Sequence, residues 1–306
     1  MTRLLFYTDL QLSGKTPRHR VDDYPSALVE KVAEIYERAT AERCEFVVFG
    51  GDFFNNHKIF SYDVINRVME PICSSDLTTY VVLGQHDVHG YNPKTYETST
   101  MAFMARHCEK LEVMWGPTEV GEVELWPCHV WEKLEDAKGK MMPPGRVNVL
   151  VAHQSITNKK KFFDVESTAD FGVGCPYDLV LSGHMHDGYD THVVDGTTFC
   201  NPGAVSRGAM DEIDRVPMVA VIEVGAGRPP AVRLLPIECV KPGSDVFGQD
   251  VAEIVRDMSE FDANAFVRGM DELEAESVDV YDLVQKAGKE EGIPKPVLAY
   301  IDSKRK

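Results

Sequence analysis

The feature that most constrains this chain is a repeated pattern, in which a short apolar segment is followed at once by potential metal-binding side chains. The pattern occurs after five segments, and the donor residues are Asp9 and Gln11, Asp52, Gln85 and His86, His153, and His184 and His186. In open α/β sheets, the loops that follow the carboxyl ends of strands converge on one crevice. We therefore expect the five loops to bring their donor side chains to one place.

The order of predicted elements indicates the fold class. The first half alternates strands at 4–8, 46–49 and 80–83 with amphipathic helices at 26–41, 62–73 and 95–107. Beyond residue 112 we expect short strands with little helix, at 120–126, 147–152, 179–182, 191–194, 197–200, 219–223 and 232–236. This order predicts a mixed β-sandwich flanked by helices, α+β or α/β in class, whose first part is wound in βαβ fashion.

A break near residue 240 divides the chain. A length of 306 residues suits one large domain or two unequal ones, and the segment Val240-Lys241-Pro242-Gly243-Ser244 precedes an acidic stretch. We predict a main domain at 1–240 and a small, mostly helical region at 241–306, with helices at 251–258, 263–273 and 280–287.

The donor types indicate a centre for two metal ions. A carboxylate such as that of Asp52 can bridge two cations about 3.5–4 Å apart. Mixed imidazole, carboxylate and amide ligands suit manganese, iron or zinc better than calcium. Taken singly, Asp52 after Gly51 is more often part of an ordinary turn, whereas His184 and His186 on an extended segment face the same way. The order of all five motifs favours the metal interpretation.

The composition limits the partners and the location. The formal net charge is −17, whereas a protein that binds DNA mainly by neutralising phosphates carries a basic surface. No apolar run approaches about 18 residues, so no membrane span is predicted, and the apolar segment at 4–7 is too short for a signal peptide. Seven cysteines without a CxxC pair favour free thiols in a reducing compartment, and hence a cytoplasmic protein.

The motif series resembles that of the calcineurin-like metallophosphoesterases over roughly residues 1–205. The matching motifs are Asp9-x-Gln11, Gly51-Asp52, Gly84-Gln85-His86-Asp87, His153 and Gly183-His184-x-His186. Within that superfamily the chain is most similar to the SbcD/Mre-eleven-type DNA repair nucleases of bacteria or phages, through residues 50–54 and the segment Asn201-Pro202-Gly203-Ala204-Val205-Ser206-Arg207. The resemblance implies a four-layer α-β-β-α sandwich with a small C-terminal capping region.

The resemblance also implies a role for each donor. One cation would be held by Asp9, Gln11, Asp52 and His186, and the other by Asp52, Gln85, His153 and His184. His86 would lie beside the scissile phosphate as a catalytic residue, oriented by Asp87. A metal-activated hydroxide would then attack phosphorus in line with the leaving group. The two divalent ions would be manganese, with magnesium, iron or zinc as alternatives.

Two positions depart from the family pattern, and four others are candidate substrate contacts. Gln11 stands where the family usually has histidine, and Gln85 where it has asparagine. An amide is a weaker ligand than imidazole, so we expect the first cation to be held loosely. The candidate substrate contacts are Asn55, Lys159, Lys160 and Arg207. Lysines interleaved with aromatic residues at 158–163 could follow a phosphate backbone, although such loops are more often simply solvated.

Three functions remain open from the sequence. The first is a metal-dependent DNA nuclease, a 3′→5′ exonuclease with single-strand endonuclease activity in DNA repair, recombination or replication. It would work as a homodimer with an SbcC-type ABC ATPase that carries coiled-coil arms. The second is a phosphatase or small-molecule phosphodiesterase that uses the same centre. The third is a catalytically impaired scaffolding subunit.

Overall fold

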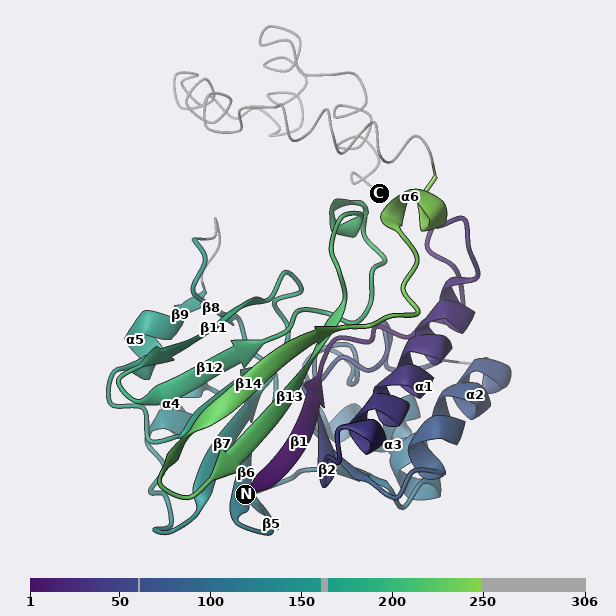
Figure 1. Ribbon diagram of the computed structural model, residues 1–306. Helices are drawn as coiled ribbons and strands as arrows, with labels where there is room; N and C mark the ends of the chain where they lie inside the picture. The colour runs from purple at the N-terminus through teal and green to yellow at the C-terminus, as the bar shows by residue number, and fades with distance from the viewer. Residues whose placement is uncertain (60, 161–164, 249–306) are drawn as a thin grey trace, which may run out of the picture.

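Two six-stranded mixed sheets pack face to face in the computed structural model, which describes residues 1–59, 61–160 and 165–248 (Figure 1). The first sheet has the strand order β14-β13-β1-β2-β3-β4. Its strands are β1 (Thr2–Tyr7), β2 (Phe46–Phe49), β3 (Thr78–Val81), β4 (Leu111–Val113), β13 (Met218–Gly225) and β14 (Arg228–Pro236). Strands β1 to β4 are parallel, and β13 and β14 complete the sheet in antiparallel pairing.

The second sheet has the strand order β11-β12-β10-β7-β6-β5. Its strands are β5 (Thr118–Val120), β6 (Val123–Cys128), β7 (Val147–Ala152), β10 (Leu179–Ser182), β11 (Tyr189–Val194) and β12 (Thr197–Asn201). Its four central strands are parallel, and β5 and β11 are antiparallel edges. A separate pair consists of β8 (Ile156–Thr157) and β9 (Glu166–Ser167).

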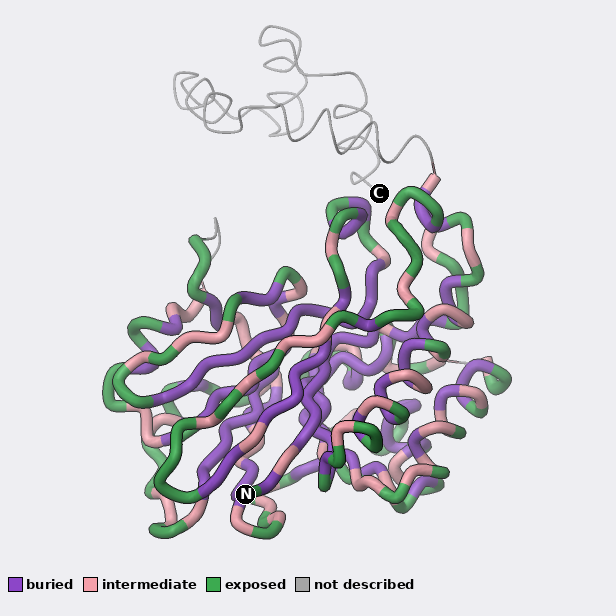
Figure 2. Tube along the Cα trace, in the orientation of Figure 1, coloured by how far each residue is buried: buried purple, intermediate pink, exposed green. Residues whose placement is uncertain are grey.

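Alternating side chains divide the core into layers. In β1, Leu4 and Phe6 pack between the two sheets, whereas Leu5 and Tyr7 pack against the helices of the first sheet, as the period of two along a strand requires. The outer face of the second sheet has its own buried cluster, which includes Leu150. Strands β2, β7, β10 and β12 are buried at every position (Figure 2). The structure therefore confirms the predicted α-β-β-α order of layers.

Helices cover the outer faces of the two sheets (Figure 1). The first sheet is covered by α1 (Tyr24–Ala41), α2 (Tyr62–Cys73), the 3₁₀ helix η1 (Pro93–Thr98) and α3 (Thr100–His107), and the second by α4 (Leu134–Lys138) and α5 (Thr168–Gly172). The 3₁₀ helix η2 (Met210–Glu212) and α6 (Gly243–Val246) contribute instead to a separate small apolar cluster. The apolar stripe of α2, which includes Val64 and Val68, packs into the core of the first sheet. The main-domain elements thus lie close to their predicted positions.

Two predicted elements are each divided at one position. The predicted helix at 95–107 is interrupted at Ser99, whose extended backbone caps α3 because its side chain accepts a hydrogen bond from the Ala102 N–H. The predicted strand at 120–126 is a hairpin of β5 and β6, with a two-residue turn that begins at Gly121 (φ +59°). Each element is divided by a local feature, the helix cap at Ser99 or the turn at Gly121.

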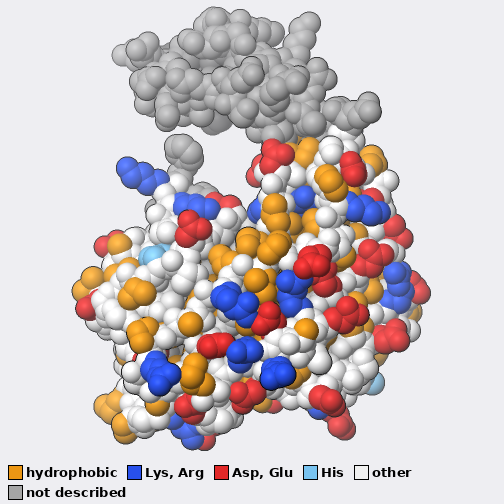
Figure 3. All heavy atoms as spheres, in the orientation of Figure 1, with side chains coloured by type: hydrophobic (Ala, Val, Ile, Leu, Met, Phe, Trp, Pro, Cys, Tyr) orange, Lys and Arg blue, Asp and Glu red, His pale blue; other side chains and the backbone are white. Residues whose placement is uncertain are grey.

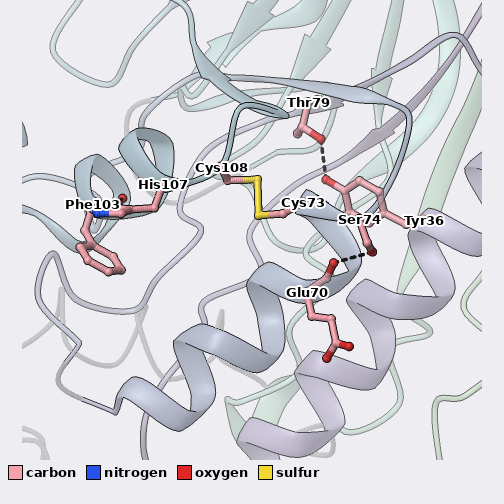
Figure 4. The surroundings of a disulfide bond; sticks show 8 residues. All are labelled: Tyr36, Glu70, Cys73, Ser74, Thr79, Phe103, His107 and Cys108. Atoms are coloured by element: carbon pink, nitrogen blue, oxygen red, sulfur yellow. Dashed lines mark hydrogen bonds between the residues drawn. A yellow bond between two sulfur atoms is a disulfide. The ribbon is translucent and has the colours of Figure 1, made fainter.

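The prediction that all cysteines are free thiols is wrong for one pair. Cys73, at the end of α2, forms a disulfide with Cys108, which follows α3 (Figure 4). Cys44, Cys128, Cys175, Cys200 and Cys239 are free. The pairing depends on the packing of two helices whose cysteines are 35 residues apart in the sequence, which the sequence spacing alone did not reveal.

The beginning of the predicted C-terminal region packs on the main domain. Val246 and Phe247 form a small apolar cluster with Met210 and Ile213. The three helices predicted at 251–258, 263–273 and 280–287 lie outside the described residues, so the boundary at 240 stays a prediction. Over the part of the chain that is described, every helix is too short or too polar to cross a lipid bilayer.

Candidate metal centre

The predicted donors meet at the carboxyl edges of both sheets. Asp9 and Gln11 follow β1, Asp52 follows β2, and Gln85 follows β3 in the first sheet. His153 follows β7 and His184 and His186 follow β10 in the second. Parallel pairing places the ends of β1, β2 and β3 side by side, and likewise the ends of β7 and β10. The donors therefore face one another across the junction of the sheets.

Four of these donors have backbones in the left-handed region. The φ angles are +53° at Asp9, +50° at Gln11, +56° at Asp52 and +73° at His184. Such conformations cost about 1–3 kcal/mol each in residues other than glycine, and they cluster at functional sites. Backbone hydrogen bonds hold the loops in this shape, from Asp9 N to Gly51 O (3.0 Å) and from Gln11 N to Asp52 O (3.0 Å).

The first donor group lies around the Asp9 carboxylate. Asp9 Oδ2 accepts hydrogen bonds from Thr8 Oγ1 (2.7 Å) and from the backbone N–H of His184 (2.9 Å). Asp9 Oδ1 is buried and accepts no hydrogen bond, and the Nε2 atom of His186 lies 3.5 Å from it. Gln11 Nε2 donates to Asp52 Oδ2 at 2.8 Å. Gln11 thus presents a donor N–H to the group, and ligation through its oxygen requires the amide to turn over.

The second donor group lies around the Gln85 amide oxygen. Gln85 Oε1 is 3.0 Å from His153 Nε2 and 3.1 Å from His184 Nδ1. His153 Nε2 is also 3.6 Å from Asp52 Oδ2. The other ring nitrogen of His153 donates to the Gly50 carbonyl at 2.7 Å, which fixes the ring and directs Nε2 toward the group.

These separations fit divalent cations. Ligand atoms lie about 2.0–2.2 Å from zinc and similar ions, which places neighbouring ligands roughly 3.0–3.5 Å apart in octahedral or tetrahedral geometry. In the second predicted set the separations between donor atoms are 3.0, 3.1 and 3.6 Å, and in the first set Asp9 Oδ1 and His186 Nε2 are 3.5 Å apart. Asp9, Asp52 and His153 also form a buried group whose ligand atoms all lie within 4.8 Å of one another. The donors and the unpaired Asp9 Oδ1 therefore suit bound metal.

The electrostatics of the centre are those of a site built for positive charge. Burial opposes the charged form of His153, but the Asp52 carboxylate outweighs it and raises the pKa of His153 to about 9. Burial likewise opposes the charge of His186, but its close contacts with the carboxylates of Asp9 and Glu212 raise its pKa to about 10. For Asp9, burial is outweighed by His186 and His153, which lower its pKa to about 2. Bound cations would replace the two imidazole protons.

Close approach of the loops requires glycine at two positions. A Cβ atom on Gly84 would overlap the Asp52 carboxylate, and one on Gly183 would overlap Thr8 Oγ1 and the Gly50 carbonyl. Neither loop could carry a larger residue without moving its neighbouring donors.

His86 lies at the open side of the donor groups. Its Nε2 atom is 3.7 Å from Asp52 Oδ2, and its side chain is 43% exposed. The His86 backbone N–H donates to Asp52 Oδ1 at 2.8 Å, which fixes the position of the residue. His86 can therefore meet a substrate without leaving the centre.

The sequence led us to expect that Asp87 orients His86, but its carboxylate contacts other groups instead. Its buried carboxylate accepts hydrogen bonds from the backbone N–H groups of Asp52 (2.9 Å), Phe53 (3.0 Å) and Gly84 (2.9 Å). Burial and the Asp52 charge raise the pKa of Asp87 to about 7. Asp87 thus ties the loop after β2 to the loop after β3.

Glu212 is a functional candidate that the sequence analysis missed. Its Oε1 atom lies 3.1 Å from His186 Nδ1, and its Oε2 atom accepts hydrogen bonds from the Gly208 and Ala209 N–H groups (2.8 and 3.0 Å). Burial alone would raise the pKa of this carboxyl, but His186 and Arg215 lower it to about 2. Glu212 therefore orients His186 with a charged acceptor. Because it lies 26 residues after His186, no local motif marks it.

The segment Asn201–Arg207 joins two loops of the centre through hydrogen bonds. Asn201 Nδ2 donates to the Met185 carbonyl (3.1 Å). The backbone N–H groups of residues 204, 205 and 206 donate to the carbonyls of His186, Thr8 and Asp9, respectively (3.0, 3.0 and 3.1 Å). The segment thus holds the loop after β10 against the loop after β1.

Among the four predicted substrate contacts, Arg207 differs from the other three in its burial. It is buried, and its guanidinium donates to the carbonyls of Ile213, Arg215 and Lys241. This arrangement gives Arg207 a structural role. Asn55 and Lys160 are exposed. Lys159 is exposed too, and its Nζ atom contacts Asp187, next to His186, at 2.9 Å (carbonyl) and 3.4 Å (carboxylate).

A cavity of about 420 Å³ opens beside the histidines that follow β10. It is lined by His184, Met185, His186, Asp187, Ala209, Asp211, Glu212 and Arg215. Its size is in the range of small-molecule pockets. Its lining combines three carboxylates with one arginine and two histidines.

Comparison with known proteins agrees with this geometry. The model of the calcineurin-like phosphoesterase family matches residues 2–188, a range that contains all seven predicted ligands. The chain belongs to this family. A phosphoesterase is a hydrolase of phosphate esters, and the family binds divalent metals. The buried group of Asp9, Asp52 and His153 is therefore a candidate site for such ions.

Individual relatives of this calcineurin-like phosphoesterase are distant. The chain is 26% identical over 193 residues to "Putative phosphoesterase 078R" of Invertebrate iridescent virus 3, an alignment of 56% of this chain and 51% of the relative. The chain thus spans about half the length of that relative. Among solved structures, the protein TT1561 of Thermus thermophilus and a dimetal phosphatase from Danio rerio have TM-scores of 0.49 and 0.48. Both are 11% identical, and in both alignments 78% of this chain covers 99% of the other.

Proposed function

We propose that this phosphoesterase cleaves phosphodiester bonds in DNA, as a 3′→5′ exonuclease with single-strand endonuclease activity. The observation that carries the proposal is the position of His86, half-exposed and 3.7 Å from the carboxylate shared by both donor groups. A phosphate seated over Asp52 would lie within reach of the His86 imidazole, which can stabilise its charge or protonate the leaving oxygen. The similarity of the motif series to SbcD/Mre-eleven-type nucleases supports DNA as the substrate.

Each residue of the centre has a defined task in this mechanism. Two divalent ions, when bound, would neutralise the phosphate oxygens and activate water for attack on phosphorus. Asp52 would contribute to both sites, because its Oδ2 atom lies near Gln11, His153 and His86. His153 and His186 are held by Gly50 and Glu212, respectively, through their second ring nitrogens. These contacts keep the ligands in place before substrate arrives.

Charge determines how DNA could approach. The chain has a formal net charge of −17, and on the face shown in Figure 3 basic and acidic side chains are interspersed. The bound cations would therefore supply the main attraction for phosphate, helped at the border of the centre by Lys159 and Lys160. We expect DNA binding to depend strongly on the metal.

A small-molecule phosphatase or phosphodiesterase is the second candidate. The cavity of about 420 Å³ beside His186 favours it, since the carboxylates in its lining could accept hydrogen bonds from the hydroxyl groups of a small ester. A catalytically impaired scaffold is the third candidate, which the departures at Gln11 and Gln85 motivate.

The native metal and the assembly are also proposals. We propose Mn²⁺ for both sites, with Mg²⁺, Fe²⁺ or Zn²⁺ as alternatives, because the ligands are mixed oxygen and nitrogen donors. We further propose a cytoplasmic homodimer that works with an SbcC-type ABC ATPase with coiled-coil arms. Sedimentation with and without such an ATPase would test this assembly.

One set of assays separates the three functions. The protein is incubated with Mn²⁺ and labelled single-stranded DNA, duplex DNA or a chromogenic phosphodiester, beside the variant His86→Ala. DNA degradation that the substitution abolishes supports the nuclease. Turnover of the small ester alone supports the second candidate and contradicts the nuclease, and inactivity on every substrate supports the scaffold.

A further inference from the structure

Four aromatic side chains pack against one another beside the centre. The ring of Trp115 meets Tyr96 edge-on, with centroids 5.0 Å apart, and lies nearly parallel to Trp131 at 6.4 Å. His129 stacks on Trp131 at 4.7 Å with an angle of 16° between the rings. We call Tyr96, Trp115, His129 and Trp131 the aromatic platform. None of these residues is a predicted ligand or catalytic group.

The aromatic platform lies at the same edge of the fold as the metal donors. Trp115 follows the carboxyl end of β4, and His129 and Trp131 follow that of β6. His129 Nδ1 accepts a hydrogen bond from the Leu83 N–H (3.0 Å), at the start of the loop that carries Gln85 and His86. Since consecutive Cα atoms are about 3.8 Å apart, the Cα atoms of Leu83 and Gln85 are at most about 7.6 Å apart.

The aromatic platform is fixed in place by its buried members Tyr96 and His129 and reaches solvent through Trp115. His129 Nε2 donates to the Met114 carbonyl (2.8 Å), which joins the segment after β4 to the segment after β6. Trp115 is nevertheless 58% exposed, so the burial of apolar surface in the fold does not explain its position. Trp126 provides a contrast, because it is half-buried against the core of the second sheet, where its Nε1 donates to Asn148 (3.3 Å). An exposed tryptophan on a rigid support is suited to stacking with a flat ligand.

We propose that the aromatic platform binds an unpaired nucleobase of the nucleic-acid strand whose phosphate lies in the metal centre. The inference rests on the proposed nuclease function. It adds a requirement for single-stranded character next to the cleaved bond, because a paired base presents no free face. Stacking on aromatic side chains is worth about 1–3 kcal/mol per base and does not depend strongly on base identity. The platform would therefore supply affinity that the acidic protein does not obtain from charge.

The test compares two oligonucleotides that differ only in their bases. The dissociation constants of the full chain are measured by fluorescence anisotropy in Mn²⁺ for a short oligothymidylate and for an abasic strand of the same length, both with nuclease-resistant phosphorothioate linkages to limit cleavage. We expect the oligothymidylate to bind about tenfold more tightly. Trp115→Ala should abolish this preference without weakening the binding of the abasic strand, and Trp115→Tyr should largely keep it. Trp126→Phe is the matched control and should change neither constant.

Two outcomes would overturn the proposal: equal affinities for the two strands in the unaltered protein, or a preference that survives Trp115→Ala. Cleavage of DNA in Mn²⁺ is measured separately. DNA cleavage with no base preference would support the proposed nuclease function and refute base binding by the aromatic platform. A Trp115-dependent preference without DNA cleavage would support the aromatic platform as a nucleobase site and refute the nuclease.

Discussion

Replacement of Glu212 by glutamine tests the architecture of the centre without removing a ligand. Glu212 holds His186 through an ion pair of 3.1 Å, while its other oxygen accepts two backbone N–H groups. In Glu212→Gln, an NH₂ group replaces one of the two carboxylate oxygens. This NH₂ group must face either His186 or the two backbone N–H groups. If the NH₂ group faces His186, then Nδ1 of the ring must become an acceptor, and the proton moves to Nε2, the atom that faces Asp9.

The expected magnitude follows from the loss of one charged contact to a ligand. Loss of such a contact reduces metal affinity about 10–100-fold, which corresponds to about 1.4–2.7 kcal/mol. The effect should fall on the cation held by Asp9, Gln11 and His186, because the other donor group makes no contact with Glu212. That cation is already the weaker one if Gln11 is a poor ligand.

Isothermal titration with Mn²⁺ into metal-free protein measures the two sites separately. We expect one of the two binding steps to weaken in Glu212→Gln while the other keeps its dissociation constant. Glu34→Gln is a matched control, since Glu34 also accepts two backbone N–H groups and pairs with one arginine, but contacts no donor. Unchanged binding at both sites in Glu212→Gln, or equal weakening of both, would refute this account of His186.

Three further results are expected. His86→Ala should lower kcat for a phosphodiester about 10²–10⁴-fold while Mn²⁺ titrates as before; a large loss of metal affinity would show that His86 is a ligand instead. The contribution of His129 to unfolding stability should fall by up to about 3 kcal/mol from pH 6.5 to pH 4, because burial lowers the pKa of His129 to about 4, so the unfolded chain takes up the proton first. The difference between urea titrations of the protein and of His129→Asn isolates this contribution, and a difference that does not change with pH would contradict the assignment. Removal of metal by a chelator should lower the melting temperature, and Asp52→Asn should reduce this difference; an equal difference in both proteins would place the stabilising metal elsewhere.

The donors could be predicted from the sequence because each lies directly after an apolar strand. A buried parallel strand fixes where its next residues emerge, so Asp9, Asp52, Gln85, His153 and His184 needed only the fold class to be placed together. The order of layers followed in the same way from strand composition. These features depend on short stretches of chain and on a topology that few alternatives satisfy.

The roles of Asp87, Arg207 and Glu212 could not be predicted in this way. Asp87 and Arg207 contact backbone groups of loops that are distant in the sequence, and Glu212 contacts the side chain of His186, 26 residues away. A motif shows that such a residue follows a strand, but not which amides or carbonyls surround it. Pairing of Cys73 with Cys108 likewise depends on how α2 and α3 pack. Sequence order indicated where the chemistry lies, and tertiary packing determined which polar groups support it.

The left-handed backbone at Asp9, Gln11, Asp52 and His184 sets activity and stability against each other. Glycine at any of the four would relax the main chain at once, yet it would delete a side chain that the centre needs. Selection of random variants for thermal stability alone should therefore favour glycine at these four positions and yield stable proteins without activity. Enzyme engineers who want a hardier version should keep these four positions unchanged and seek their gains in the helices.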